Sequence, residues 1–184
     1  MIRMKHIARL GGIATISLVL VGVLGLTAAS VRAQNVTDAK IASIVVTANQ
    51  VDIDAGKLAE SKASNEEVKK FAQLMITDHT GVNKQATELV TKLNVTPQDN
   101  LTSYSLQIKG EQDIAYLKTL SGAAFDKAYI DQEVTFHQLV LNAVDKTLIP
   151  SAQNAELKAL LVKVRPAFVA HLEHAKQLRA ALDK

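Results

Sequence analysis

The sequence predicts an all-α protein, an antiparallel four-helix bundle with an extra helix in the connection between its second and third helices. Three observations support this fold class. Apolar residues recur at spacings of three and four over long stretches, the chain holds only three prolines, and no stretch alternates apolar and polar residues as a strand does. Four amphipathic helices of about 25–30 residues would give a bundle about 40 Å long.

The first 33 residues have the order of an export signal. Met1–Arg9 carries three basic residues and no acidic one, an apolar run follows from Ile13 to Ala29, and small residues flank Arg32 directly before Gln34. We therefore expect an exported, periplasmic protein that is cleaved after Ala33 and has no stable membrane insertion afterwards. The alternative is a retained membrane anchor, because the apolar run approaches the length that spans a bilayer.

Residues 34–184 are long enough to form one domain with a core of its own. Removing residues 1–33 takes away four of the 21 basic residues and none of the 18 acidic ones, so the formal net charge changes from +3 to −1. The basic character of the precursor is therefore no evidence for a nucleic-acid partner. The chain has no cysteine, which excludes disulfides, thiolate catalysis and iron–sulfur ligation.

The first helix is expected from about Asp38 to Lys62, with Thr37 as its N-cap. The second helix is expected to begin at Ser64, because Ser64 and Glu67 have the S-x-x-E spacing of a capping box. Its apolar face continues to Leu93 and includes one histidine. The core positions on this face are Val68, Phe71, Ala72, Met75, His79, Val82, Ala86 and Leu89.

Residues 99–120 are expected to form a less regular connecting helix that Gly110 weakens in its middle. The third helix of the bundle is expected to start after Ser121-Gly122 and to end before Pro150, with His137 on its apolar face. The fourth is expected to start after Ser151 and to reach nearly to Lys184, with a histidine at position 171 on its apolar face. Pro166 should kink this last helix, and the alternative is two shorter helices.

Three histidines on three different helices, His79, His137 and His171, are the candidate site residues, together with Asp52 and Glu133. A buried imidazole needs partners for both ring nitrogens. Three that converge would form either a metal or ligand site or a structural polar network. Imidazole with carboxylate suits a transition metal ion such as iron, copper, zinc, nickel or manganese, whose affinity falls on acidification.

The level of these histidines in the bundle can be estimated by counting from the helix starts. His79 and His137 lie near mid-height, and His171 lies nearer the far end of a longer helix. A shared level then requires the last helix to overhang the bundle at its start. Two polar neighbours are expected outside the site: Asp78 should bind solvent or a neighbouring helix, and His174 should be exposed.

Other chemistries have little support in the sequence. The E-x-x-H pattern of dimetal carboxylate bundles is absent, since Ile76, Val134 and Phe168 stand three residues before the candidate histidines. There is no nucleophile elbow, phosphate-binding loop or dinucleotide fingerprint. The few aromatic residues follow helix-core spacing and form no platform for nucleic-acid bases.

Several motifs together resemble one family. They are D-I-D-A-G-K-L-A at 52–59, K-A-S-N-E-E-V-K-K-F-A at 62–72, M-I-T-D-H at 75–79, L-S-G-A-A-F-D-K-A-Y at 120–129, His137 with Gln132 or Glu133 upstream, and H-L at 171–172. This pattern is similar to the exported bacterial family called domain of unknown function 4142. The resemblance covers most of residues 34–184, with Asp52 and Asp54 in place of glutamates.

The resemblance implies a ferritin-like helical bundle in the cell envelope, with the recurrent histidines of the family at His79, His137 and His171, and it implies no established reaction. The leading interpretation is a mostly monomeric, non-catalytic envelope protein that binds a metal ion or a small ligand through these histidines. One alternative is a metal-dependent oxidoreductase of ferritin-like type, which needs an open coordination position and a redox metal. The other is a structural or stress-protective interaction protein without a ligand.

Cleavage after Ala33 is the first testable prediction. The protein recovered from the envelope fraction should begin at Gln34, because the basic, apolar and small-residue segments occur in the order that signal peptidases require. Intact mass spectrometry measures this directly. A membrane pellet that holds the chain with residue 1 still attached would show that the anchor alternative is correct.

Overall fold

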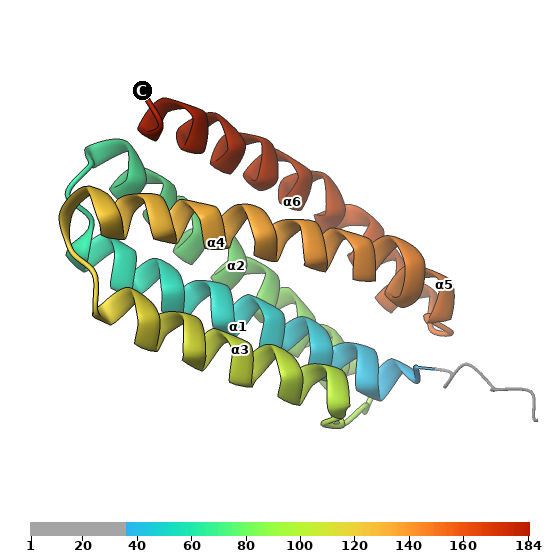
Figure 1. Ribbon diagram of the computed structural model, residues 1–184. Helices are drawn as coiled ribbons and strands as arrows, with labels where there is room; N and C mark the ends of the chain where they lie inside the picture. The colour runs from blue at the N-terminus through green and yellow to red at the C-terminus, as the bar shows by residue number, and fades with distance from the viewer. Residues whose placement is uncertain (1–35) are drawn as a thin grey trace, which may run out of the picture. The chain divides into compact units, whose positions relative to one another are not determined.

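A computed structural model describes residues 36–184, and the described chain is all-α (Figure 1). Its helices are α1 (Asp38–Lys62), α2 (Glu66–Lys92), α3 (Leu101–Lys118), α4 (Gly122–Ala143), a π-helical turn η1 (Val144–Leu148), α5 (Ile149–Ser151) and α6 (Ala155–Leu182). Among these helices, none is both long and apolar enough to cross a membrane. The expected signal segment lies outside the described residues.

The helices α1, α2, α4 and α6 surround the core, and α3 packs along α1 (Figure 1). The neighbours α1 and α2 are antiparallel, as are α4 and α6. Because α3 carries the chain back along the bundle, α2 and α4 start at the same end and run in the same direction (Figure 1). The expected connecting segment is therefore a regular helix that spans most of the bundle.

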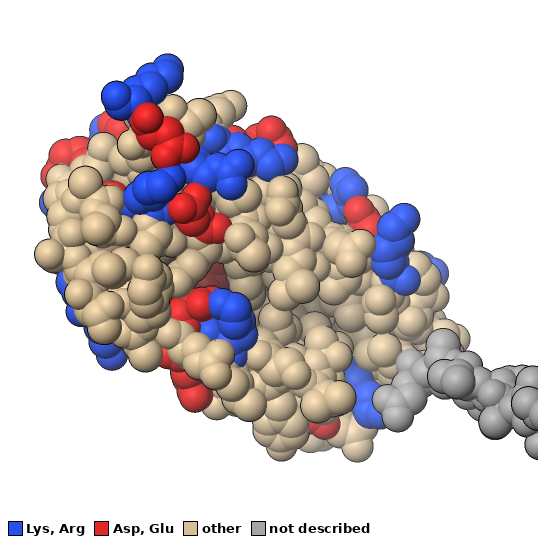
Figure 2. All heavy atoms as spheres, viewed as in Figure 1, with Lys and Arg blue, Asp and Glu red and all other residues tan. Residues whose placement is uncertain are grey.

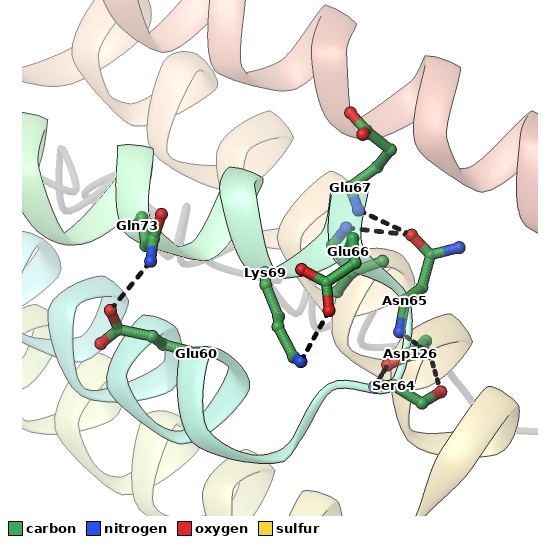
Figure 3. A network of polar contacts seen from close by, with 9 residues as sticks. Glu60, Ser64, Asn65, Glu66, Glu67, Lys69, Gln73 and Asp126 are labelled. Carbon is green, nitrogen blue, oxygen red and sulfur yellow. Dashed lines mark hydrogen bonds and ion pairs between the residues drawn. The ribbon is translucent and has the colours of Figure 1, made fainter.

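The loop between α1 and α2 is held by an aspartate of α4. The carboxylate of Asp126, which is 1% exposed, accepts hydrogen bonds from the backbone amides of Ser64 and Asn65 and from the Ser64 hydroxyl (Figure 3). Ser64 is therefore unavailable as a cap. Asn65 caps α2 instead, accepting from the amides of Glu67 and Val68, so the predicted Ser64–Glu67 capping box is wrong.

A second aspartate joins the chain at the opposite end of the bundle. Asp38, in the first turn of α1, accepts hydrogen bonds from the backbone amides of Gln153 and Asn154 at 2.9 Å each. Asn154 is in turn the N-cap of α6. The start of the first helix is thereby tied to the start of the last, and the two amide groups that precede α6 are satisfied.

The predicted bounds of the first helix agree with the structure, whereas the predicted end of the third helix before Pro150 is wrong. Thr37 caps α1, and α1 ends at Lys62 as expected. The helical path of α4 continues through η1 and α5 past Pro150, which occupies the first turn of α5, where a missing amide proton is tolerated. The last helix, α6, is one helix with Pro166 inside it, so the alternative of two shorter helices is wrong.

Gly110 has a different role from the predicted weak point in α3. It is buried where α3 meets α1, and a β-carbon at this position would lie 2.7 Å from Cγ1 and 2.8 Å from Cγ2 of Val51. The absence of a side chain lets the two helix backbones approach closely. Gly110 therefore determines how tightly α3 packs against the bundle.

The apolar core consists of two clusters. One contains Phe71, Phe125 and Tyr129 and lies toward the α1–α2 loop, while the other contains Ile41 and Leu157 and lies toward α5 (Figure 1). The buried polar residues Asp52, His79, Glu133, His137 and His171 are distributed along the helices between these ends. The fold therefore places a polar layer inside an otherwise apolar interior.

Two glycines offer a matched test of the packing between α1 and α3. Gly110→Ala should lower the free energy of unfolding by about 1–2 kcal/mol, because the clash with the β-branched Val51 exceeds the gain in helix propensity. Gly81→Ala in α2 should raise it by about 0.5–1 kcal/mol, since nothing lies within 4 Å of its added β-carbon. Chemical denaturation measures both, and equal stabilisation by the two substitutions would contradict the close approach.

Candidate metal centre in the helix core

The five candidate residues meet at one level of the bundle. Because α1 and α6 run toward the end from which α2 and α4 start, positions must be counted from that end (Figure 1). His79 and His137 lie 13 and 15 residues after the first residues of α2 and α4, and Asp52 and His171 lie 10 and 11 residues before the last residues of α1 and α6. At a rise of ~1.5 Å per residue, all four lie about 15–22 Å from the same end, so no overhang of α6 is needed.

The three imidazoles pack against one another. The ring centroids of His79 and His137 are 5.6 Å apart, those of His79 and His171 are 5.3 Å apart, and those of His137 and His171 are 5.5 Å apart. All three side chains are at most 3% exposed. Each ring offers one nitrogen that lies within 4.8 Å of a nitrogen of the other two, so the three side chains can reach a single ion.

Asn49 orients His79. The Asn49 amide nitrogen donates to the carbonyl of Val45 at 2.9 Å, which leaves its oxygen facing the imidazole, and this oxygen lies 2.7 Å from Nδ1 of His79. An amide oxygen only accepts, so Nδ1 must be the protonated nitrogen. The ring of Phe168 stacks on His79 with an interplanar angle of 6° and holds its plane. Nε2 is left without a hydrogen-bond partner.

The same pattern recurs in the other two histidines. Nδ1 of His137 donates to the backbone carbonyl of Glu133 at 3.0 Å, and its Nε2 has no hydrogen-bond partner. Nε2 of His171 lies 2.9 Å from a carboxylate oxygen of Asp78, and its Nδ1 has no hydrogen-bond partner. Each imidazole is therefore fixed by one nitrogen and presents the other.

The carboxylate of Asp52 lies among the free nitrogens. One of its oxygens, Oδ2, is 3.0 Å from Nε2 of His79 and 3.6 Å from Nε2 of His137. Neither contact has the direction of a hydrogen bond, and both oxygens of Asp52 are buried without a hydrogen-bond partner. The side chain is 1% exposed.

Glu133 completes the polar layer on α4. Its Oε2 atom lies 3.4 Å from Nδ1 of His137, and a ligand atom from each of Glu133, Asp52 and His137 lies within 4.8 Å of the others. The buried Tyr129, one turn earlier on the same helix, has a hydroxyl group without a hydrogen-bond partner. Glu133 is thus positioned to support His137 or to serve as a further ligand.

The protonation of these groups reflects their burial and their charged neighbours. Burial raises the pKa of Glu133 to about 7, and the carboxylate of Asp52 adds to the rise. Burial opposes a charge on His137, but the neighbouring Glu133 and Asp52 raise the pKa of His137 to about 9. Burial also opposes ionisation of Asp52, yet the charges of His79 and His137 hold its pKa below the usual value. The acidic groups therefore require positive charge close by.

An apolar cavity of about 400 Å³ reaches this layer from the surface. Asp52, His79 and His137 line the cavity, together with residues of α3, η1 and α6, so one side of the cluster is accessible. Figure 2 shows that the molecular face above it is hollowed between α4 and α3. Among the described residues, this cavity links the candidate site to its surroundings.

The sequence identified the five residues that the structure brings together, and it missed Asn49, which holds one of them. Asn49 is a polar residue within the apolar face of α1, and its position three residues before Asp52 is the signal that was available. Asp78 was expected to bind solvent or a neighbouring helix, and it contacts His171 of α6. His174 is half-buried with its ring against Phe71 and lies outside the cluster.

Comparison with known proteins gives one result. The sequence model of a family described as a domain of unknown function (DUF4142) matches residues 25–178. The match covers most of the chain, so the chain belongs to this family, for which no function is assigned. No curated protein and no solved structure was found to match.

Proposed function

We propose that this member of the DUF4142 family is an exported protein that binds one transition metal ion through His79, His137, His171 and Asp52. One observation carries the proposal. Three buried imidazoles are each held by a hydrogen bond at one nitrogen, and the other nitrogens have no partner beside a buried, unpartnered carboxylate. A positive ion is the group that would satisfy all of these atoms together.

The distances in the cluster support a shared ion. Two ligand atoms bound at about 2.0–2.2 Å to one ion in tetrahedral geometry lie roughly 3.3–3.5 Å apart. The contacts of the Asp52 oxygen with His79 and His137, at 3.0 and 3.6 Å, lie on either side of this range. Small side-chain shifts are therefore enough to complete coordination.

The hydrogen bonds around the cluster favour the same conclusion. Metal-binding histidines usually donate their second N–H group to a carbonyl or carboxylate oxygen, which fixes the ring and makes the free nitrogen a better ligand. Here those oxygens belong to Asn49, to the backbone of Glu133 and to Asp78. Three nitrogens and one oxygen suit the later first-row metals better than magnesium or calcium.

Two further points belong to this proposal. We place the protein in the periplasm or otherwise outside the cytoplasm, on the order of basic, apolar and small residues in residues 1–33. We assign the bundle to the ferritin-like arrangement, because α3 connects α2 to α4 in a way that makes these two helices parallel (Figure 1).

A structural polar core without a ligand is the second candidate. It is favoured by the close approach of Glu133 to His137, since a proton on His137 would supply the positive charge that Asp52 and Glu133 require. The two candidates differ in what the cluster takes up. A metal centre binds one ion per chain, whereas a structural network binds none.

Metal content tests the proposal. Protein purified without chelator and then incubated with Mn²⁺, Co²⁺, Ni²⁺, Cu²⁺ or Zn²⁺ should retain about one ion of at least one of these metals per chain, by elemental mass spectrometry after desalting. His79→Ala, His137→Ala and His171→Ala should each reduce retention at least tenfold. His174→Ala is the matched control, because His174 shares α6 with His171 but lies outside the cluster.

Circular dichroism separates loss of the site from loss of the fold. The helical signal should persist in chelator, because the two apolar clusters bury enough surface to hold the bundle together. Each folded histidine variant should then lack the ion. Absence of the ion from the unsubstituted protein under every condition would establish the structural network instead. Retention of the ion by all three variants would show that it binds outside the histidine cluster and would overturn the proposed site.

Asn49 provides a test of orientation. Asn49→Ala removes the acceptor that holds His79, so the dissociation constant of the ion should rise about 10- to 100-fold while saturating stoichiometry stays at one. Asn83→Ala is the control, since Asn83 also donates its amide to a carbonyl of α1 but does not contact the cluster. Competition with a calibrated chelator measures both. Equal metal affinity in the two variants would show that Asn49 does not orient His79 for metal binding.

A further inference from the structure

The cavity that reaches the cluster has apolar walls and a polar inner end. Its walls are formed by apolar side chains from five helical segments, among them Ala48 of α1, Leu106 of α3, Ala143 of α4, Val144 of η1 and Val164 of α6. At its inner end lie Asp52, His79 and His137. The cavity volume of about 400 Å³ is within the range of small-molecule sites.

The polar end is buried and lacks hydrogen-bond partners. Asp52, His79 and His137 are at most 3% exposed, and each has atoms without a hydrogen-bond partner. The outer end is formed by Leu101 and Leu139, which are 83% and 54% exposed. Figure 2 shows uncharged residues around much of this opening. A ligand that fits must therefore be apolar along its length and polar at one end.

We propose that the cavity binds an aliphatic carboxylic acid, with its chain along the apolar walls and its carboxylate on the metal ion held by Asp52 and the three histidines. This inference rests on the metal site proposed above. It adds a class of ligand and an open coordination position that faces the cavity.

The carboxylate head group of the proposed ligand is inferred from the side chains at the inner end of the cavity. When their imidazoles are neutral, the unpartnered nitrogens of His79 and His137 present lone pairs, as do the oxygens of Asp52. A bound ion would then be the electrophile at this end, and a head group that approaches it must supply electrons. A carboxylate does so with oxygen ligands and adds negative charge beside the cation. An alkylammonium group would instead compete with the metal for the same lone pairs.

The aliphatic tail of the proposed ligand is inferred from the apolar walls of the cavity. Apart from the residues at the inner end, the lining is aliphatic or aromatic save for Asn49 of α1 and Thr102 and Ser105 of α3. The amide of Asn49 is already engaged with Val45 and His79. The hydroxyl of Ser105 already donates to the carbonyl of Leu101. Each methylene group that moves from water into such a lining strengthens binding by roughly fourfold, at about 0.8 kcal/mol per group. Affinity should therefore increase with chain length until the cavity is filled.

The test uses the full bundle loaded with Co²⁺, whose visible absorption bands report its ligands. Titration with decanoate should change these bands and saturate at one molecule per ion. A series from butanoate to decanoate should tighten binding by about three- to fourfold per methylene, and acetate should bind far more weakly. Metal-free protein should bind decanoate at least tenfold more weakly, because the carboxylate then faces Asp52 without an ion between them.

Two exposed aliphatic residues provide matched variants. Leu139→Glu places a negative charge at the opening and should weaken decanoate binding at least tenfold. Val162→Glu makes the same change at an equally exposed position of α6 outside the cavity lining, and should alter binding less than twofold. Ala143→Phe, which fills the cavity, should abolish binding. All three should retain the ion, as measured by elemental mass spectrometry.

The outcomes separate the two proposals. If no metal is retained, the metal site itself fails, and the ligand assignment fails with it. If Co²⁺ is retained but its absorption bands do not change on addition of decanoate, the proposed metal site is supported and the ligand assignment is wrong. Equal binding of acetate and decanoate, or unchanged binding by Leu139→Glu, would each overturn the assignment.

Discussion

The structure depends on one constraint: two carboxylates and three imidazoles share a buried layer of the core. Each unpaired buried polar atom costs roughly 1–3 kcal/mol, so the arrangement is tolerable only if the surroundings fix the rings and a positive charge lies between them. Asn49, Asp78 and the Glu133 carbonyl fix the rings. The charge comes from protons or from an ion, and the two compete for the same lone pairs. The apolar clusters lie at either end of this layer, and the cavity reaches it from one side.

The topology makes this layer possible. Residues on α2 and α4 reach it from helix starts at one end, and residues on α1 and α6 reach it as those helices arrive at the same end (Figure 1). The α3 helix produces this geometry because it reverses the chain between α2 and α4, and Gly110 lets it do so in close contact with α1. Asp38 and Asp126 fix the two ends of the bundle through backbone amides. Helix register, and with it the level of each histidine, is thus set by a few polar contacts at the ends.

Much of the fold could be predicted from the sequence, because apolar spacing reports directly which face of a helix is buried. The bounds of α1 and the core positions of His79, His137 and His171 follow from that spacing alone. The predictions that failed concern contacts between helices distant in sequence. Ser64 has the spacing of a capping residue, but Asp126, 62 residues later, takes its hydroxyl. Gly110 has poor helix propensity, yet its role is set by Val51. For the same reason Asn49 was missed, since its partner His79 lies on another helix.

The cavity distinguishes between the interpretations of the polar layer. A network that serves only to stabilise the core gains most when each polar atom has a partner and is surrounded by packed side chains. Here the free atoms of Asp52, His79 and His137 lie at the inner end of an apolar cavity, so they are neither paired nor packed on that side. Filling the cavity with larger side chains at Ala48 or Ala143 would bury more apolar surface, and the chain has small residues at both positions. Small residues beside ligand atoms that lack hydrogen-bond partners are typical of a site that binds an ion or a small molecule. We therefore interpret the polar layer as a binding site.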